Sequence, residues 1–319
     1  MRAAEIRVAG QPPVVAGRPD PEPGPGEVAV SVTAAPITPL DLLCASGASY
    51  FGVPSTPYVP GVQGVGVLTR PTPTHLAGTP VWFATTAGMR PGDGSMADRA
   101  VVAPEDLVVL PPGADHTLVA ALGLSAVAAW MCLTATGRLA PGETVLVLGA
   151  GGVVGQAALQ LARVAGAGHV VACARSDAAL ERALRLGADR VVRLEEGDDA
   201  GSLARRLGEA AGPVDLVIDP VCGIPAAAAL RTLRQGGRLV NLGSAAGDEF
   251  AVPSAVLRSR SLRVLGYTNN ELTADERGEA LLTVVAHAMA GHLTVRYERA
   301  PLADAADAWT RPGRIVLVP

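Results

Sequence analysis

Short apolar, β-branched runs alternate with segments of helical apolar spacing through the middle of the chain. The strand-like runs are residues 144–148, 169–174, 190–194, 214–218, 238–242 and 262–265. Segments with a helical rhythm lie between them, at residues 156–164, 177–186, 202–211 and 225–233. This alternation predicts an α/β fold with a doubly wound parallel sheet, whose ligand binds at the carboxyl ends of the strands.

A glycine-rich turn follows the first of these runs, with Gly149, Gly151, Gly152 and Gly155 between strand and helix. Glycines let the backbone turn sharply and approach a ligand closely, and a helix N-terminus favours an anion. A tight turn of this kind is also compatible with a purely structural role. The surrounding alternation of strands and helices favours a dinucleotide whose pyrophosphate lies at the turn.

The regions on either side of this pattern are mostly β-like. The expected strands before it are residues 1–8, 27–35, 64–69, 80–84 and 97–103. After it we expect a helix at 273–291, an extended segment at 293–298, a helix at 303–309 and a strand at 314–318. We therefore predict a substrate domain formed by residues 1–122 and 268–319, and a dinucleotide-binding domain formed by residues 123–267.

The composition is typical of a soluble globular protein, with its apolar excess in Ala, Val and Leu. Apolar residues make up 49% of the chain but aromatic residues only 3%, and neither a membrane-spanning run nor a signal-peptide core stands out. We expect a cytoplasmic protein with no membrane partner. The net charge of −4 without a basic face argues against nucleic acid as a partner.

Two residue types limit the chemistry. All 26 cationic side chains are arginines, so lysine Schiff-base catalysis is excluded. The four cysteines are far apart and lack Cys-x-x-Cys spacing, which favours buried thiols over disulfides or a metal.

Several motifs resemble the medium-chain dehydrogenase/reductase superfamily. They are 36–41, Tyr58-Val59-Pro60-Gly61, 94–102, 144–162, Leu186-Gly187-Ala188-Asp189, 214–223, 236–243 and 313–319. Within this superfamily the chain is most similar to the zinc-free quinone oxidoreductase (zeta-crystallin-like) branch. The resemblance implies a GroES-like catalytic domain beside a Rossmann domain, and a homodimer formed by edge pairing through residues 262–265.

The resemblance also bears on metal use. Zinc-dependent alcohol dehydrogenases of the superfamily have a cysteine near the position of Thr38 and a His-Glu pair where this chain has Val62-Gln63. These residues are not a zinc ligand set, so no metal is expected. Hydride transfer to a small quinone or an α,β-unsaturated carbonyl compound is then favoured over alcohol chemistry.

Cofactor choice depends on the segment Ala174-Arg175-Ser176 after the second run. A guanidinium and a hydroxyl suit the 2′-phosphate of NADPH, whereas NADH needs a carboxylate there. Alternatively, Arg175 is a solvated loop residue and Ser176 the N-cap of the next helix. Asp177, one residue further on, could reach the ribose hydroxyls, so NADH stays an alternative cofactor.

The resemblance extends the expected cofactor contacts to later strand ends. The expected cofactor-binding residues are Gly149, Ala150, Gly151, Gly152, Val153, Val154, Gly155, Arg175, Ser176, Asp219, Val221, Leu242, Gly243, Ser244, Gly266 and Tyr267. One departure is that Val127-Ala128-Ala129 stands where the family has Leu-Thr-Ala, so a hydroxyl near the nicotinamide is missing.

Candidate catalytic residues are Tyr50, Asp41 and Thr38. Asp41 is a candidate proton relay, although Thr38-Pro39-Leu40-Asp41 also has the form of a helix capping box. Tyr50 and Tyr267 are candidate partners for a planar substrate, against a packing role for each. The sequence predicts an NADPH-dependent quinone or enone reductase, with two alternatives: a tailoring reductase for one biosynthetic intermediate, or an NADPH-binding protein with little turnover.

Overall fold

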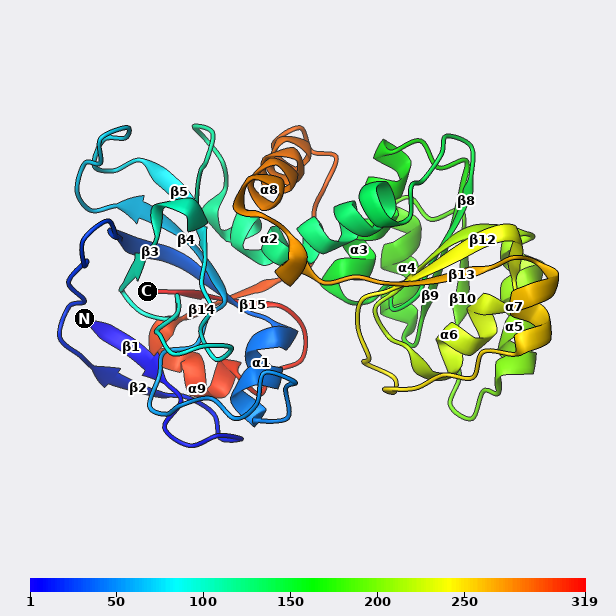
Figure 1. The fold of residues 1–319 in the computed structure, drawn as a ribbon, viewed down its shortest axis with the longest axis horizontal. Coiled ribbons are helices and arrows are strands. Elements are labelled where there is room, and N and C mark those ends of the chain that lie inside the picture. The colour runs from blue at the N-terminus through cyan, green and yellow to red at the C-terminus, as the bar shows by residue number, and fades with distance from the viewer. The chain divides into compact units, whose positions relative to one another are not determined.

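A computed structural model describes residues 1–319, which form two compact units (Figure 1). The first unit contains Met1–Gly123, Ala274–Met289 and Val295–Pro319. The second contains Leu124–Thr273 and Ala290–Thr294. Each unit is therefore assembled from segments that are distant in sequence.

The first unit is rich in short strands. They are β1 (Arg2–Glu5), β2 (Val14–Gly17), β3 (Val28–Ile37), β4 (Gln63–Leu68), β5 (Pro80–Ala84), β6 (Arg99–Val102), β7 (Leu107–Val109), β14 (Glu298–Pro301) and β15 (Ile315–Val318). One sheet has the order β14-β15-β3-β4-β5-β7, with β6 also on β3, while β1 and β2 form a separate pair. Alternating residues of β3, such as Val30 and Val32, enter a core that β15 completes through Ile315 and Leu317. The C-terminal strand thus closes the sheet that the N-terminal part begins.

The second unit holds the predicted parallel sheet. Its strands are β8 (Thr144–Val147), β9 (His169–Ala174), β10 (Arg190–Arg193), β11 (Val214–Asp219), β12 (Leu233–Asn241) and β13 (Arg263–Gly266). They are all parallel, in the order β10-β9-β8-β11-β12-β13. The order reverses at β8, so this is a doubly wound Rossmann sheet and the predicted α/β fold class is confirmed.

Helices cover both faces of this sheet. They are α3 (Val153–Val164), α4 (Asp177–Arg185), α5 (Ala200–Ala211), α6 (Gly223–Leu230) and α7 (Ser254–Ser259). Leu203 and Leu207 of α5 and Ala226 and Leu230 of α6 share one core cluster with the sheet. Figure 1 shows α3 and α4 on the other side. Because both faces are covered, the strands are apolar throughout rather than alternating.

The helix α2 (His116–Met131) runs into a π-helical turn, Cys132–Thr136. It is kinked at Gly123, where φ is 34° and ψ is −135°, a conformation that favours glycine. Residues 116–136 are long and apolar enough to cross a membrane, with a mean hydropathy of 2.0, which the sequence analysis overlooked. However, 61% of that window is buried inside the protein, as in the core helix of a soluble protein.

The remaining helices belong to the first unit: α1 (Pro39–Ser46), α8 (Ala274–Met289) and α9 (Ala305–Ala308). Some predicted elements are wrong in extent. The helix expected at 225–233 ends at Leu230, and Leu233 already begins β12, because a turn at Arg231 and Thr232 separates them. The extended segment at 293–298 forms a strand only from Glu298, where pairing with β15 starts. The strands β2 and β7 and the helix α7 were not predicted.

Candidate functional site

The predicted cofactor residues gather along one edge of the second unit's sheet. Each ends a parallel strand, lies in the loop after one, or begins the helix that follows. Hydrogen bonds continue between these loops beyond the strands: Ala150 N–H donates to Cys173 O, Leu242 N–H to Asp219 O and Tyr267 N–H to Asn241 O. The structure thereby brings residues from 149 to 267 to a single edge.

The glycine-rich turn forms one end of this edge. Gly149 has φ 61°, and a Cβ atom on Gly155 would lie only 2.4 Å from Gly149 O. Gly152 is the N-cap of α3 and provides no side-chain cap, so the first N–H groups of the helix have no side-chain acceptor. An uncapped helix N-terminus beside exposed glycine backbone is a site for an anionic group.

At the end of β9, Arg175 and Asp177 have different surroundings. The exposed Arg175 guanidinium has no hydrogen-bond or ion-pair partner, whereas Arg193 of β10 forms an ion pair with the Asp177 carboxylate. Arg193 Nη1 also donates to Arg175 O over 3.2 Å. Ser176 is the N-cap of α4 and accepts from Ala179 N–H, as the N-cap alternative predicts.

The loop after β11 is organised by the buried Asp219. Its Oδ1 accepts from the N–H groups of Val221 (3.1 Å) and Cys222 (2.8 Å). Burial raises the pKa of Asp219, while hydrogen bonds from Asn241, Cys222 and Val221 oppose this shift. Asn241 Nδ2 donates to Asp219 Oδ2 and to Gly243 O, which fixes two of the predicted cofactor loops to each other.

The end of β13 carries Gly266 and Tyr267. The Tyr267 hydroxyl donates to Asn269 Oδ1 over 2.7 Å, and Asn269 Nδ2 donates to Leu124 O. The phenol thus has a local partner within the second unit. Val127, Ala128 and Ala129, which replace the family's hydroxyl-bearing segment, are buried in α2.

The candidate catalytic residues Thr38 and Asp41 lie in the first unit at the start of α1. They form the predicted capping box, and Asp41 Oδ1 also accepts from the N–H groups of Gly61 (3.1 Å) and Val62 (2.9 Å). Burial raises the pKa of Asp41, against hydrogen bonds from Thr38 and Val62 and the charge of Arg314. The carboxylate therefore joins α1 to the segment before β4.

Tyr50, the third candidate, is on the surface of the first unit, with 77% of its area exposed. Its ring lies 4.3 Å from that of Phe51 between centroids, at 38°. The role of Tyr50 as a partner for a planar substrate stays a prediction from the sequence.

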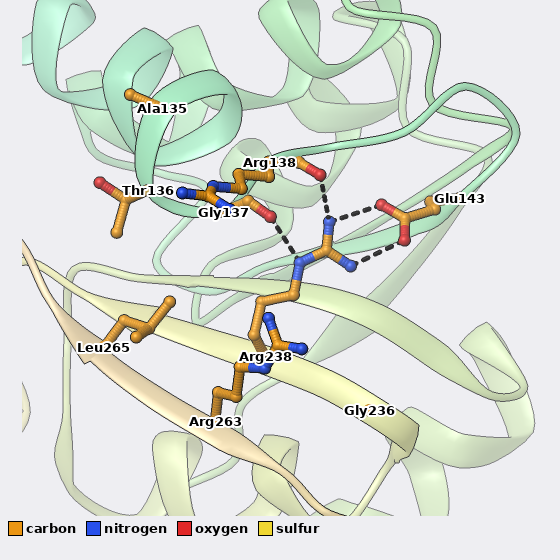
Figure 2. A pocket seen from close by; sticks show the side chains of 9 residues that line it. All are labelled: Ala135, Thr136, Gly137, Arg138, Glu143, Gly236, Arg238, Arg263 and Leu265. Carbon is orange, nitrogen blue, oxygen red and sulfur yellow. Dashed lines mark hydrogen bonds and ion pairs between the residues drawn. The ribbon is translucent and has the colours of Figure 1, made fainter.

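A pocket of about 570 Å³ lies at the opposite, amino edge of the second unit's sheet. Figure 2 shows its lining, with Arg138, Arg263 and Arg238 around it. Arg238 is buried, and its guanidinium donates to both carboxylate oxygens of Glu143 and to the carbonyls of Gly137 and Arg138. The lining of this pocket reaches Leu265 on β13, directly before the predicted cofactor residue Gly266.

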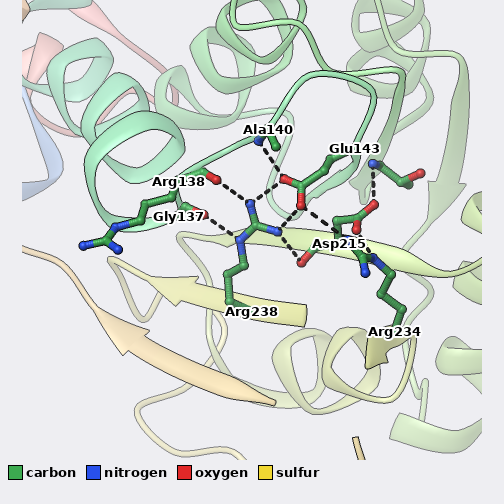
Figure 3. Close-up of polar contacts among 8 residues, drawn as sticks. Gly137, Arg138, Ala140, Glu143, Asp215, Arg234 and Arg238 are labelled. Atoms are coloured by element: carbon green, nitrogen blue, oxygen red, sulfur yellow. Dashed lines mark hydrogen bonds and ion pairs between the residues drawn. The ribbon is translucent and has the colours of Figure 1, made fainter. Parts of the chain in front are cut away.

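The same edge contains an ion cluster that the sequence analysis missed. Figure 3 shows Glu143 between Arg238 and the Asp215–Arg234 ion pair, with Asp215 also accepting from Thr144 N–H. Its members are up to 95 residues apart. Only the folded sheet brings them together, so no local motif could have revealed them.

Comparison with known proteins identifies the family to which the chain belongs. A family model described as "Zinc-binding dehydrogenase" matches residues 153–284. The chain is 30% identical over 251 residues to the rat "Quinone oxidoreductase-like protein 2", covering 76% of this chain and 68% of that protein. The chain belongs to the medium-chain dehydrogenase/reductase superfamily, in its quinone oxidoreductase branch. It is a quinone oxidoreductase-like NAD(P)H oxidoreductase.

Two further relatives fit this membership. Human "Quinone oxidoreductase" is 28% identical over 282 residues, covering 86% of this chain and 82% of that protein. The solved structure of the quinone oxidoreductase from Thermus thermophilus, described with its NADPH complex, has a TM-score of 0.77 and 29% identity over the whole of both chains. The superfamily predicted from the motifs is therefore confirmed.

Zinc, which the family model's description names, does not fit the residues of this quinone oxidoreductase homologue. The Thr38 hydroxyl donates to Asp41, and Gln63 Oε1 accepts from Trp82 Nε1. No group of three or more His, Cys, Asp or Glu side chains is arranged to hold a metal ion. A dinucleotide fits better, because α3 has no side-chain cap and a Cβ atom at Gly152 would meet nothing closer than Gly149 O at 3.6 Å.

Proposed function

We propose that this protein transfers hydride from NADPH to a quinone or an α,β-unsaturated carbonyl compound, without a metal. The observation that carries the cofactor choice is the end of β9, where Arg175 lacks a partner and Asp177 is paired with Arg193. A free guanidinium favours a 2′-phosphate, whereas an ion-paired carboxylate is a poor acceptor for ribose hydroxyls.

In this proposal, the chain's own residues bind the cofactor and orient it toward the substrate. NADPH, when bound, supplies the hydride. The backbone N–H groups after Gly152 hold the pyrophosphate, and Arg175 holds the 2′-phosphate. The rest of the NADPH molecule lies along Gly243, Ser244, Gly266 and Tyr267. Hydrogen bonds from Asn241 to Asp219 and Gly243 hold the loops after β11 and β12 together. Such positioning contributes to rate by fixing the reacting groups.

On the substrate side we propose that Tyr50 supports the ring of the acceptor. Thr38 and Asp41 position the segment at Gly61 and Val62 through the hydrogen bonds described above. No acidic side chain is required in this scheme, because a hydrogen bond stabilises the enolate-like charge and solvent supplies the proton.

The deciding experiment follows cofactor absorbance as the protein is mixed with NADPH or NADH and a panel of quinones and enones. We expect oxidation of NADPH in preference to NADH, and at least a tenfold loss of that preference in Arg175→Ala. Arg185→Ala, a solvent-exposed arginine at the far end of α4, is the matched control.

A second candidate function shares the cofactor site. The missing hydroxyl at Val127-Ala128-Ala129 favours a tailoring reductase with one dedicated substrate, or a protein with little turnover. Tight NADPH binding without reduction of any acceptor in the panel would favour these over the general reductase, and absence of NADPH binding would reject all of them.

We also propose a cytoplasmic homodimer. The strand β13 is at the sheet edge, and Arg263, Val264 and Gly266 on it are exposed, so its backbone is open to pairing with a second copy. Light scattering at working concentration tests this, and a monodisperse monomer would reject it.

A further inference from the structure

Carboxylates crowd the same corner of the sheet at which a 2′-phosphate is proposed to bind. Asp177 begins α4, and Glu195 and Asp198 lie in the loop after β10. Like charges repel, so uncompensated carboxylates here would oppose a phosphate and favour the ribose hydroxyls of NADH.

Two arginines neutralise these carboxylates. Arg206 of α5 pairs with Glu195 at 3.0 Å and with Asp198, and its Nη1 donates to the backbone carbonyl of Arg193 at 3.0 Å. Arg193 in turn pairs with Asp177. The backbone of Arg193 is thus held from α5 while its side chain extends to α4.

The position of Arg193 within the sheet makes this pairing specific. Arg193 is the last residue of β10 and lies in register with Ala174, the last residue of β9. Its Nη1 donates to the carbonyl of Arg175, the next residue along. One guanidinium therefore links the backbone beside the proposed phosphate ligand to the carboxylate that would compete with it.

We propose that Arg193 sets cofactor preference together with Arg175, by withholding Asp177 from the ribose and leaving Arg175 free for the 2′-phosphate. This inference rests on the proposed NADPH-dependent function. Arg193 is a positioning residue here, because it acts through Asp177 rather than on the cofactor itself.

In this role, removing the Arg193 side chain has opposite effects on the affinity for NADPH and for NADH. Without the Arg193 charge, Asp177 repels the 2′-phosphate of NADPH and becomes available to the hydroxyls of NADH. If Arg193 instead contacted the phosphate directly, its removal would weaken the binding of NADPH alone. The two mechanisms therefore differ in what happens to NADH and in whether a change at Asp177 compensates.

The test is a set of equilibrium titrations of the full-length protein with NADPH and with NADH, followed by nucleotide fluorescence without any acceptor. The variants are Arg193→Gln, Asp177→Asn and the double variant, at one low ionic strength. Arg190→Gln is the matched control, since Arg190 is an exposed arginine at the opposite end of the same strand.

We expect Arg193→Gln to raise the Kd for NADPH about tenfold and to lower the Kd for NADH about threefold. In the double variant the gain for NADH disappears and NADPH binding returns to within about threefold of the parent. Arg190→Gln leaves both constants unchanged.

Three outcomes would overturn the inference while leaving the proposed function standing: no change in either constant, equal changes in both, or a loss for NADPH that Asp177→Asn does not restore. If the parent protein does not prefer NADPH, the proposed cofactor assignment itself fails. Thermal unfolding of each variant checks folding, and because the pair is largely exposed we expect the midpoints to agree.

Discussion

The amino and carboxyl edges of the Rossmann sheet differ in how their polar groups are paired. At the amino edge, Arg238 and Glu143 satisfy each other and the carbonyls of the turn before β8. At the carboxyl edge, α3 has no side-chain cap and Arg175 has no partner. Both edges carry charge, but the buried arginine and carboxylate at the amino edge are paired with each other, whereas the Arg175 guanidinium at the carboxyl edge has no partner.

Because of this difference, the paired groups contribute to the stability of the fold and the unpartnered groups are available for ligand binding. Buried groups that satisfy one another hold the strands in register, and removing one partner leaves an unpaired charge. Groups without partners near solvent cost little in the free protein and are available to a ligand. We therefore expect variants of the buried, paired groups at the amino edge to affect unfolding, and variants of the unpartnered groups at the carboxyl edge to affect nucleotide affinity.

The largest effect is expected from Arg238→Met. It leaves the Glu143 carboxylate, whose side chain is only 14% exposed, without its main partner, which costs about 3–5 kcal/mol of unfolding free energy. Chemical denaturation measures this. Arg263→Gln is the control, because Arg263 is in register with Arg238 on the next strand but is exposed. Equal losses in the two variants would contradict a special role for the buried arginine.

Two alanine substitutions in the glycine-rich turn sharpen the comparison. In Gly155→Ala the new Cβ atom would lie 2.4 Å from Gly149 O, so we expect a loss of about 1–3 kcal/mol in stability together with lost NADPH binding. In Gly152→Ala the nearest atom is 3.6 Å away and φ is −80°. This variant should unfold like the parent within about 0.5 kcal/mol yet bind NADPH at least tenfold more weakly. Unchanged affinity in Gly152→Ala would place the pyrophosphate elsewhere.

Acid should weaken the amino edge. Burial alone raises the pKa of Glu143, but hydrogen bonds from Arg238 and from Ala140 N–H, with the Arg238 charge, bring it below its usual range. A carboxyl group with a lowered pKa in the folded state contributes stability above its unfolded pKa of about 4.3. That contribution is lost as the pH falls through the folded value. Denaturation from about pH 6 to about pH 3 should show a smaller decline for Glu143→Gln than for the parent, and parallel declines would exclude this source.

The smallest effect concerns backbone strain at the carboxyl edge. Cys222 has φ 60° and ψ −155°, a region that is almost restricted to glycine. Cys222→Gly should raise the unfolding free energy by about 1 kcal/mol. Cys222→Ala keeps the Cβ atom and should show no gain. A gain in both variants would mean that the thiol, and not the backbone, is responsible.

Much of the fold was predictable because it is encoded locally. The strands β5 and β9 have the predicted bounds, since a run of β-branched and apolar residues is bounded by turn residues on each side. The Thr38–Asp41 capping box was likewise visible as a four-residue pattern. Very short strands such as β7 were missed, because three residues carry no periodicity of their own.

By itself, the sequence determined the alternation of strands and helices, the glycine-rich turn and the membership of the superfamily, since each depends on neighbours along the chain. Only the tertiary structure decided which charges meet. Arg238 finds Glu143 across 95 residues, and Arg193 finds Asp177 across the gap between adjacent strand ends. Hydrophobic period specifies which face of an element is buried, but the partner of an arginine depends on strand order and register, which exist only once the sheet has formed.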